Sequence, residues 1–189
     1  MSLSWLEPLP IDVVRAPDTD GRIGMSYCPG RFLRGWGLIG GQRDLPTDLE
    51  RIRRWGARTM VTLLQESEFR TLGVPDLAET VPAQGFDWFH APIRDFSAPG
   101  SAFELAWAEA GPVVRERLRH GEDVLLHCRA GLGRTGTVAA RLLVEFGDDP
   151  ETAIATVRRA RQGTVENVEQ ADYIRGLTNL QGLAWREIS

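Results

Sequence analysis

The chain has 189 residues, of which 42% are hydrophobic and 25% are charged. This composition is typical of a soluble globular protein, and the length fits one substantial core. We therefore expect residues 1–189 to form a single domain, with residues 1–30 as an N-terminal hairpin or extension. The formal net charge of −4 argues against a nucleic acid as partner, and an anionic substrate would need a local positive pocket.

The chain has two cysteines, Cys28 and Cys128, so a disulfide scaffold is unnecessary and a reducing compartment is the simpler interpretation. The sequence contains neither the apolar segment of a signal peptide nor a run of about 18 apolar residues that could span a membrane. We therefore expect a cytoplasmic protein without membrane insertion. His90, His120 and His127 are too scattered for a metal cluster, so we expect neither a metal nor a cofactor.

Strand and helix signals alternate along the chain. Apolar runs at residues 11–14 and 23–27, separated by turn residues, predict a short hairpin. A strand at 36–39 and a helix from Pro46 or Thr47 to Trp55 follow, with Asp44 as a capping residue. The further predicted elements, in chain order, are a strand at 59–64, helical pieces at 66–72 and 75–83, a strand at 86–90, a loop at 92–100, a helical stretch at 101–120, a strand at 123–127, and helices at 134–146, 150–161 and 168–184.

The order of these elements predicts the fold class. Strands that alternate with helices favour a central, mostly parallel, twisted sheet flanked by helices, which is an α/β fold. Gly111-Pro112 must bend or split the helical stretch at 101–120, because proline lacks the amide hydrogen and its ring clashes with the preceding turn. Ligands of open α/β sheets bind at the carboxyl ends of the strands.

One such strand end carries the most informative segment, His127-Cys128-Arg129-Ala130-Gly131-Leu132-Gly133-Arg134-Thr135-Gly136. The backbone amides of residues 128–134, the phosphate loop, can curl around an oxyanion, and the glycines permit the tight path. The helix that follows points its positive end at the same spot, and Arg134 offers a planar fork for two phosphate oxygens. This field favours the thiolate of Cys128, which would then be a nucleophile facing a bound phosphate.

Other interpretations of this segment are available. A cysteine at a strand end is often a small buried hydrophobe, which is the favoured interpretation of Cys128 taken alone. Gly131, Gly133 and Gly136 match the dinucleotide pattern G-x-G-x-x-G, but no strand with an acidic residue follows at the required distance, since Glu151 lies at a helix start. The nucleotide P-loop needs a lysine that this segment lacks.

The combination of a strand, histidine, Cys-x5-Arg-Thr and internal glycines resembles the protein tyrosine and dual-specificity phosphatases. Three stretches are similar to the cyclin-dependent-kinase-associated phosphatase subgroup: Gly40-Gly41-Gln42-Arg43-Asp44, Leu72-Gly73-Val74-Pro75-Asp76-Leu77 and Pro92-Ile93-Arg94-Asp95. The resemblance extends over residues 24–180. It implies a protein tyrosine phosphatase-like fold and a metal-independent phosphatase that forms a cysteinyl-phosphate intermediate.

The resemblance also assigns roles to individual residues. Asp95 would be the general acid on a movable loop at 92–100, the acid loop, although an isolated aspartate there would read as a turn cap. We expect the strand at 86–90 to lie beside the strand that carries Cys128. The hydroxyl of Thr135 would hydrogen-bond the sulfur, and His127 would be a buried residue that orders the loop and favours the thiolate. The phosphate-binding residues would be Arg129, Ala130, Gly131, Leu132, Gly133 and Arg134.

Four side chains have weaker assignments. Gln170 resembles the family's late glutamine and could position the hydrolytic water, although a surface polar residue is the alternative. Glu66 and Glu68 could support the site, but carboxylates at a helix start are the favoured interpretation. Arg129 could add positive charge at the pocket rim. Lipid-directed relatives carry a second basic residue where this chain has Leu132, which argues against a phosphoinositide without excluding it.

The resemblance therefore implies a phosphatase that acts on phosphotyrosine in proteins, with phosphoserine or phosphothreonine in proteins as further candidates. Small phosphate esters are the other expected class of substrate. A phosphoinositide phosphatase and a catalytically weak phosphate-binding module are the alternatives. A sulfur transferase or an arsenate reductase would not need Asp95, and the reductase would want additional redox cysteines. Cys28 is far from Cys128 in the sequence, and the sequence gives no reason to place the two cysteines together.

Overall fold

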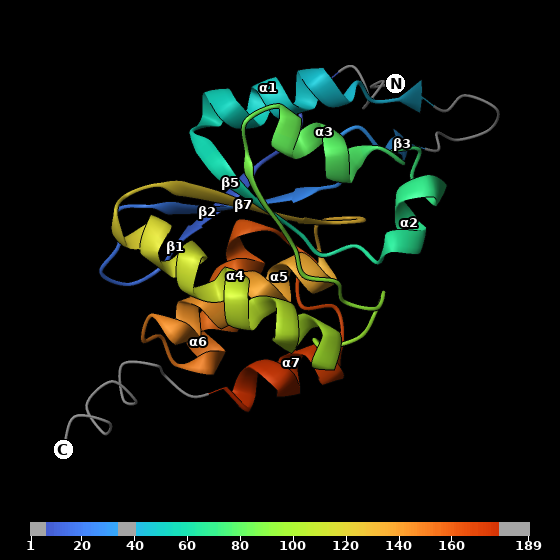
Figure 1. The fold of residues 1–189 in the computed structure, drawn as a ribbon. Coiled ribbons are helices and arrows are strands. Elements are labelled where there is room, and N and C mark those ends of the chain that lie inside the picture. Colours follow the sequence, from blue (N-terminus) through green and yellow to red (C-terminus); the bar gives the residue numbers. More distant parts are fainter. Residues whose placement is uncertain (1–6, 34–40, 178–189) are drawn as a thin grey trace.

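The computed structural model describes residues 7–33 and 41–177, which form an α/β fold (Figure 1). The strand predicted at 36–39 lies outside the described residues. The strands, in chain order, are β1 (Asp12–Arg15), β2 (Arg22–Tyr27), β3 (Phe32–Leu33), β4 (Gly41–Gln42), β5 (Ala57–Thr62), β6 (Asp87–His90) and β7 (Asp123–Cys128). The helices are α1 (Leu45–Trp55), α2 (Glu66–Thr71), α3 (Leu77–Ala83), α4 (Ser101–Arg119), α5 (Gly133–Glu145), α6 (Pro150–Ala160) and α7 (Val168–Arg175).

The central sheet has five strands in the order β1-β2-β7-β5-β6. Strands β2, β7, β5 and β6 run parallel, and only β1 is antiparallel to its neighbour β2. The mostly parallel sheet and the predicted N-terminal hairpin are thus confirmed. Strand β7 lies in the middle and is buried along its whole length, as expected for a continuous apolar strand covered on both faces.

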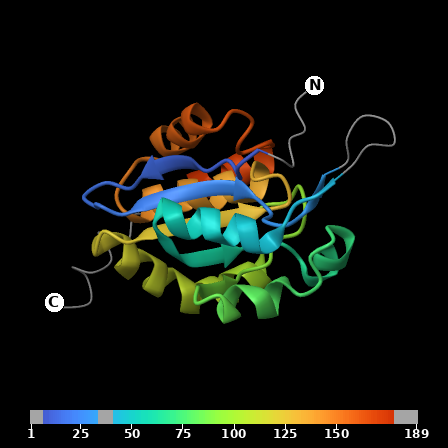
Figure 2. The same ribbon diagram turned by 90° about the horizontal axis from the view of Figure 1, so that it is seen from above.

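Helices cover both faces of the sheet, and each face has its own hydrophobic cluster (Figure 1). The apolar sides of α4, α5, α6 and α7 pack on one face, where Phe103, Val138 and Ile154 are buried. Residues of α1, α2 and α3 pack on the other face, including Leu49 and Leu77. Seen from above, α6 lies next to the β1 edge of the sheet (Figure 2). Among the described helices, none has the length and apolar character needed to cross a bilayer.

The predicted helix starts correspond to local capping interactions. Asp44 caps α1, because its Oδ1 atom accepts the amide hydrogen of Thr47 at 2.9 Å, and Gly56 ends the helix with a φ of 125°. Asp149 caps α6 in the same way and is followed by Pro150 at the first helical position. In both helices an aspartate at the N-cap is followed by a proline in the first turn, and this pattern marks the helix start.

The helical stretch predicted at 101–120 is helix α4, which runs from Ser101 to Arg119. Of the two expected effects of Pro112, a bend or a split, the split does not occur. The apolar side chains of α4 are buried against the sheet on both sides of the proline, and this packing outweighs the lost backbone hydrogen bond. The last helix was predicted to reach residue 184, but α7 ends at Arg175, before Gly176 and Leu177. Residues 178–184 lie outside the described part of the chain.

A buried ion pair joins α1 to the segment before it. The guanidinium of Arg43 binds Asp48 through Nε at 2.8 Å and Nη2 at 2.6 Å, and both side chains are almost fully buried. The same carboxylate accepts the amide hydrogen of Gly30 at 2.9 Å. Asp48 therefore compensates a buried charge and a buried backbone amide together.

Replacing Asp48 with alanine should lower the free energy of unfolding by about 3–5 kcal/mol, because it removes the carboxylate that binds the buried guanidinium of Arg43 with both oxygens. Chemical denaturation measures this difference. Glu50→Ala is the matched control on the same helix, since Glu50 pairs with Arg53 and Arg54 at the exposed surface, and it should cost no more than about 1 kcal/mol. Equal losses in the two variants would contradict the importance of the buried pair.

Candidate active site

The phosphate loop joins the end of β7 to the start of α5, at the carboxyl edge of the sheet. Its turn is pressed against β2. Gly131 has a φ of 70°, and a Cβ atom there would lie 2.4 Å from the carbonyl group of Ser26. Glycine is therefore required at this position for both its backbone angle and its lack of a side chain.

The sulfur of Cys128 lies at the base of a small pocket. The Sγ atom accepts the amide hydrogen of Gly131 at 3.2 Å, and the residue is only 3% exposed. The pocket has a volume of about 200 Å³, and its lining residues are Asp95, Phe96, Cys128, Arg129, Ala130, Gly133, Arg134 and Glu166. Because the first turn of α5 begins in this wall, the positive end of the helix and the loop amide both act on the sulfur.

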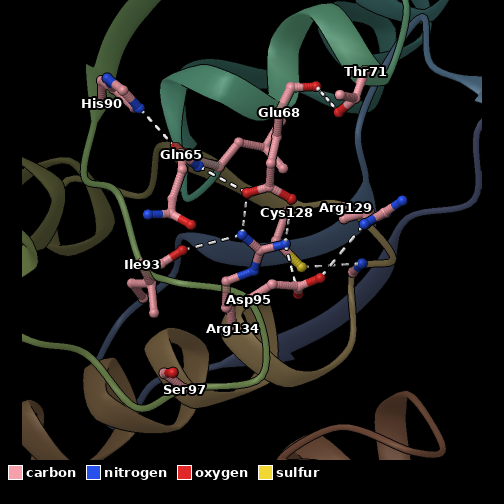
Figure 3. Close-up of polar contacts among 12 residues, drawn as sticks. Gln65, Glu68, Thr71, His90, Ile93, Asp95, Ser97, Cys128, Arg129 and Arg134 are labelled. Atoms are coloured by element: carbon pink, nitrogen blue, oxygen red, sulfur yellow. Dashed lines mark hydrogen bonds and ion pairs between the residues drawn. The ribbon is translucent and has the colours of Figure 1, made fainter.

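Arg134 is buried beneath the pocket, with 2% of its surface exposed. Glu68 of α2 binds the guanidinium with both oxygens, at 2.6 Å to Nη1 and 3.0 Å to Nη2 (Figure 3). Nη1 also donates to the carbonyl oxygen of Ile93 at 3.1 Å. Burial lowers the pKa of Arg134, but the hydrogen bond to Glu68 and the negative charges of Cys128, Glu68 and Asp95 together outweigh it, so the pKa is raised. The side chain is therefore a fixed positive charge rather than the solvated arginine of a helix start.

Asp95 reaches this arginine from the pocket side. Its Oδ1 atom lies 2.9 Å from Nη2 of Arg134, and its Oδ2 atom lies 3.6 Å from Nη1 of Arg129 (Figure 3). The Arg129 side chain is 54% exposed, so it adds positive charge at the rim as the sequence suggested. The structure thus brings Cys128, Arg134, Asp95 and Arg129 together.

The strand order corrects one step of the sequence argument. Strand β6, which leads to Asp95, does not lie beside β7, because β5 lies between them. The chain after β6 crosses the end of β5 and is held there by two backbone hydrogen bonds, from Ala91 to Thr62 at 3.0 Å and from Ile93 to Leu63 at 3.1 Å. This crossing carries Asp95 across one strand to the phosphate loop.

The acid loop is also tied to the start of α7. The side chain of Asn167 donates to the carbonyl oxygen of Phe96 at 2.7 Å, and Gln170 donates to that of Ser97 at 3.3 Å. The amide of Ala98 donates to Glu169 at 3.4 Å. Phe96 is 66% exposed and has a φ of 57°, in the left-handed region that non-glycine residues rarely adopt. These contacts hold the loop in the position where Asp95 meets Arg134.

His127 is fully buried next to the nucleophile candidate. Its Nε2 atom lies 2.7 Å from the hydroxyl of Thr62, which also accepts a hydrogen bond from Trp88 at 2.8 Å. Burial lowers the pKa of His127 to about 3, and the nearby positive charge of Arg134 acts in the same direction. The imidazole is therefore neutral at physiological pH, so it orders the end of β7 and cannot favour the thiolate through a positive charge of its own.

Thr135 does not make the contact that the resemblance implied. It is fully buried in the first turn of α5, and its hydroxyl has no hydrogen-bond partner among the described residues. The sulfur of Cys128 is bonded by the amide of Gly131 instead. The hydroxyl of Thr135 therefore has a hydrogen that it can donate to another group at the site.

Two arginines outside the phosphate loop hold its carbonyl groups, and sequence reasoning missed both. Arg31 donates to the carbonyl oxygen of Arg129, and Arg161 donates to that of Ala130 at 3.0 Å. Arg161 is itself held by Asp12 at 2.5 Å. With their carbonyl groups bound from outside, these peptide units are fixed in orientation, which favours amides that face the pocket. No sequence spacing identifies these two among the many arginines of the chain.

Glu68, Glu66 and Cys28 differ in their relation to the site. Glu68 supports the site through Arg134 and also caps α2, since it accepts the amide hydrogen of Gln65 at 2.9 Å. The helix-start interpretation was thus incomplete for Glu68, whereas Glu66 has no contact with Arg134 in the structure. Cys28 is buried in the cluster on the opposite face from the cluster of Cys128, and burial raises the pKa of its thiol.

Comparison with known families agrees with this geometry. The family model described as "Polymorphic toxin system, DSP-PTPase phosphatase" matches residues 35–148, which is more than half of the chain. The chain belongs to this family. The cysteine-dependent phosphatase superfamily predicted from the phosphate loop is therefore confirmed.

The chain is also similar to individual proteins. Cyclin-dependent kinase inhibitor 3 of Rattus norvegicus is 27% identical over 179 residues, which cover 92% of this chain and 77% of the relative. Protein tyrosine phosphatase type IVA 3 of Homo sapiens is 28% identical over 145 residues, 76% of this chain and 77% of the relative. The crystal structure of kinase associated phosphatase with a serine in place of its catalytic site cysteine has a TM-score of 0.76 at 24% identity, covering 89% and 93% of the two chains.

The contact between Glu68 and Arg134 should matter for turnover. Replacing Glu68 with glutamine removes the charge that orients the guanidinium, and kcat/KM for p-nitrophenyl phosphate should fall about tenfold or more. Glu66→Gln is the control, because it changes a carboxylate on the same helix turn without touching Arg134. Steady-state kinetics of the two variants would contradict this role of Glu68 if both retained wild-type kcat/KM.

The neutral state of His127 predicts a pH dependence of stability. Its pKa of about 3 in the folded protein lies below the usual value of 6.5, so the unfolded chain binds the extra proton. The histidine's contribution is present above about pH 6.5 and is lost as pH falls towards 3. Between these pH values, the unfolding free energy of the wild type should fall more steeply with decreasing pH than that of His127→Gln. The difference between the two slopes should be about 1.4 kcal/mol per pH unit. The free energy is measured by urea unfolding at several pH values from 4 to 6. The same dependence on pH in the wild type and the variant would contradict a neutral, buried His127.

Proposed function

We propose that this pocket hydrolyses phosphate monoesters in two steps, through a cysteinyl-phosphate formed on Cys128. The observation that carries the proposal is the sulfur at the base of the pocket, facing the loop amide of Gly131, beside the buried charge of Arg134. A phosphoryl group in this space would meet positive charge from the arginine, from the loop amides and from the helix start. Such preorganised charge stabilises the transition state of phosphoryl transfer.

In the first step, the thiolate of Cys128 attacks phosphorus while Arg134 and the loop amides bind the equatorial oxygens. The ester bond breaks, and Asp95 gives its proton to the leaving oxygen. Asp95 is suited to this role because its carboxylate, which comes from the acid loop, lines the same pocket as Cys128. The phosphoryl group takes the place of its carboxylate on Arg134. In the second step, water attacks phosphorus, Asp95 takes up a proton, and Thr135 is the buried donor available to the departing sulfur.

Phosphotyrosine in proteins is the substrate class favoured here, with phosphoserine and phosphothreonine as further substrates. A relative that is named a protein tyrosine phosphatase supports this assignment. The exposed ring of Phe96 at the pocket mouth also suits an aromatic leaving group. A phosphoinositide is less suited, because Leu132 contributes no charge where lipid-directed relatives are basic.

A phosphate-binding module without turnover is the competing function. It would need the anion-binding loop and Arg134 only, whereas this chain also holds Asp95 within 2.9 Å of that arginine. The tethers from Asn167 and Gln170 hold the acid loop in place over the pocket. A pure binding site would gain nothing from positioning a proton donor in this way.

The proposal predicts that the wild-type protein hydrolyses p-nitrophenyl phosphate in the presence of reductant and EDTA. Cys128→Ser should abolish turnover, because a serine hydroxyl is a much weaker nucleophile than a thiolate. Cys28→Ala should retain activity and controls for loss of a thiol elsewhere. Absence of turnover in the wild-type protein between pH 5 and 8 would refute hydrolysis and leave the binding module.

The role of Asp95 can be tested separately with two leaving groups. Asp95→Asn should reduce kcat about 100-fold with phenyl phosphate, since general acid catalysis contributes at least that factor. The loss should be smaller with p-nitrophenyl phosphate, because p-nitrophenolate needs less help from a proton. Equal losses for both esters, in side-by-side steady-state assays, would show that Asp95 does not protonate the leaving oxygen.

A further inference from the structure

The wall of the pocket holds a second carboxylate, Glu166, in addition to Asp95. Sequence reasoning gave the placement of the hydrolytic water to Gln170, which lies one helical turn further along the chain. The two residues are neighbours in the structure, but they differ in exposure. Glu166 lines the pocket and is exposed, whereas Gln170 is fully buried and is absent from the lining.

Both the oxygen and the nitrogen of the Gln170 side-chain amide make hydrogen bonds. Its oxygen accepts the backbone amide hydrogen of Glu166 at 2.8 Å, and its nitrogen donates to the carbonyl oxygen of Ser97 at 3.3 Å. Gln170 thereby fixes the backbone of Glu166 and the acid loop relative to each other. Its contacts make it a positioning residue, and they leave the neighbouring carboxylate as the acceptor at the pocket.

Glu166 stands directly over the start of α5. A Cβ atom built on Gly133 would lie 2.1 Å from Oε2 of Glu166 and 2.8 Å from Nε2 of Gln170, so the carboxylate and the amide together occupy the space that a side chain at this position would need. Gly133 belongs to the phosphate loop and lines the same pocket. The carboxylate is thus at the pocket wall, over the part of the phosphate loop that begins α5.

We propose that Glu166 is a catalytic residue of the second step, in which its carboxylate accepts a hydrogen bond from the attacking water and orients it towards phosphorus. This inference rests on the proposed two-step hydrolysis. Water must approach phosphorus from the side opposite the sulfur, which is the open side of the pocket. Asp95 and Glu166 both line the pocket, so one water can contact a proton acceptor and an orienting acceptor together.

The step balances with these groups alone. The water oxygen forms a bond to phosphorus, and the bond between phosphorus and Sγ breaks with its electron pair returning to Cys128 as thiolate. One water proton passes to Asp95, which regains the proton it lost in the first step. The other hydrogen stays on the new phosphate oxygen and is the one that points to Glu166 during the attack.

A carboxylate near a phosphoryl group also has a cost in charge repulsion. Arg129, which is on the same pocket wall and already pairs with Asp95 at 3.6 Å, offsets part of it. The exposure of Glu166 to solvent reduces the repulsion further. The arrangement therefore favours a carboxylate that acts on the water over one that only excludes anionic substrates.

The test is a rapid-quench measurement of the cysteinyl-phosphate in Glu166→Gln, with p-nitrophenyl phosphate as substrate and intact-protein mass spectrometry as readout. The formation rate and kcat/KM should match the wild type, because both depend only on steps up to release of p-nitrophenol. Decay of the intermediate should be about tenfold slower, a loss of about 1.4 kcal/mol of transition-state stabilisation. Glu151→Gln, which changes an exposed carboxylate that pairs with Arg175 and does not line the pocket, should leave both rates unchanged.

Three results would overturn the inference. If the intermediate decays at the wild-type rate in Glu166→Gln, the carboxylate does not act on the water. If kcat/KM rises in that variant while the decay rate is unchanged, Glu166 is a charge filter for anionic substrates. If the wild-type protein neither releases p-nitrophenol nor forms an intermediate, the proposed hydrolysis itself fails and the inference fails with it. The first two results leave the hydrolysis intact, so the two failures are distinguishable.

Discussion

Burying a guanidinium charge at the end of a sheet is the constraint on which this site depends. Arg134 is 2% exposed, and an unpaired charge at such a depth would be strongly destabilising. Glu68 compensates it with a two-oxygen contact from α2, and the carbonyl group of Ile93 accepts a further hydrogen bond. Burial of the arginine in the native structure therefore depends on the helix after β5 and on the chain after β6. Folding of these two segments and assembly of the phosphate site are in this sense one process.

The rest of the site is built by segments that reach across strands. The chain after β6 passes over the end of β5 to bring Asp95 to the phosphate loop, and the start of α7 holds it there through Asn167 and Gln170. Arg31 and Arg161 bind the loop carbonyl groups from two further directions. Parts of the chain that lie far apart in sequence thus fix a loop of seven residues. A substitution in any of them can alter turnover without touching the substrate.

The outline of the fold and the centre of the site could be predicted because their signals are local. The hairpin, the apolar strand before Cys128 and the capped starts of α1 and α6 each depend on residues close in sequence. The order of β5 and β6, the partner of Arg134 and the position of Glu166 depend on contacts between distant segments, and no spacing encodes those. Pro112 shows the opposite case, because burial of side chains on both sides of it keeps α4 from being split there. Glu68 shows that one residue can satisfy a local rule and a distant contact together.

The contact of Asp95 with Arg134 has a consequence for ligand binding. In the structure the carboxylate sits 2.9 Å from the nitrogen that binds a phosphate oxygen in the proposed mechanism, so in that mechanism the protein carries its own tethered competitor for the anion. An incoming monoester must displace it, which weakens apparent affinity by the fraction of molecules in which the carboxylate is bound. After the reaction, the same carboxylate can return to Arg134 as inorganic phosphate leaves. Weak retention of product and a modest affinity for free phosphate follow from this exchange of one anion for another.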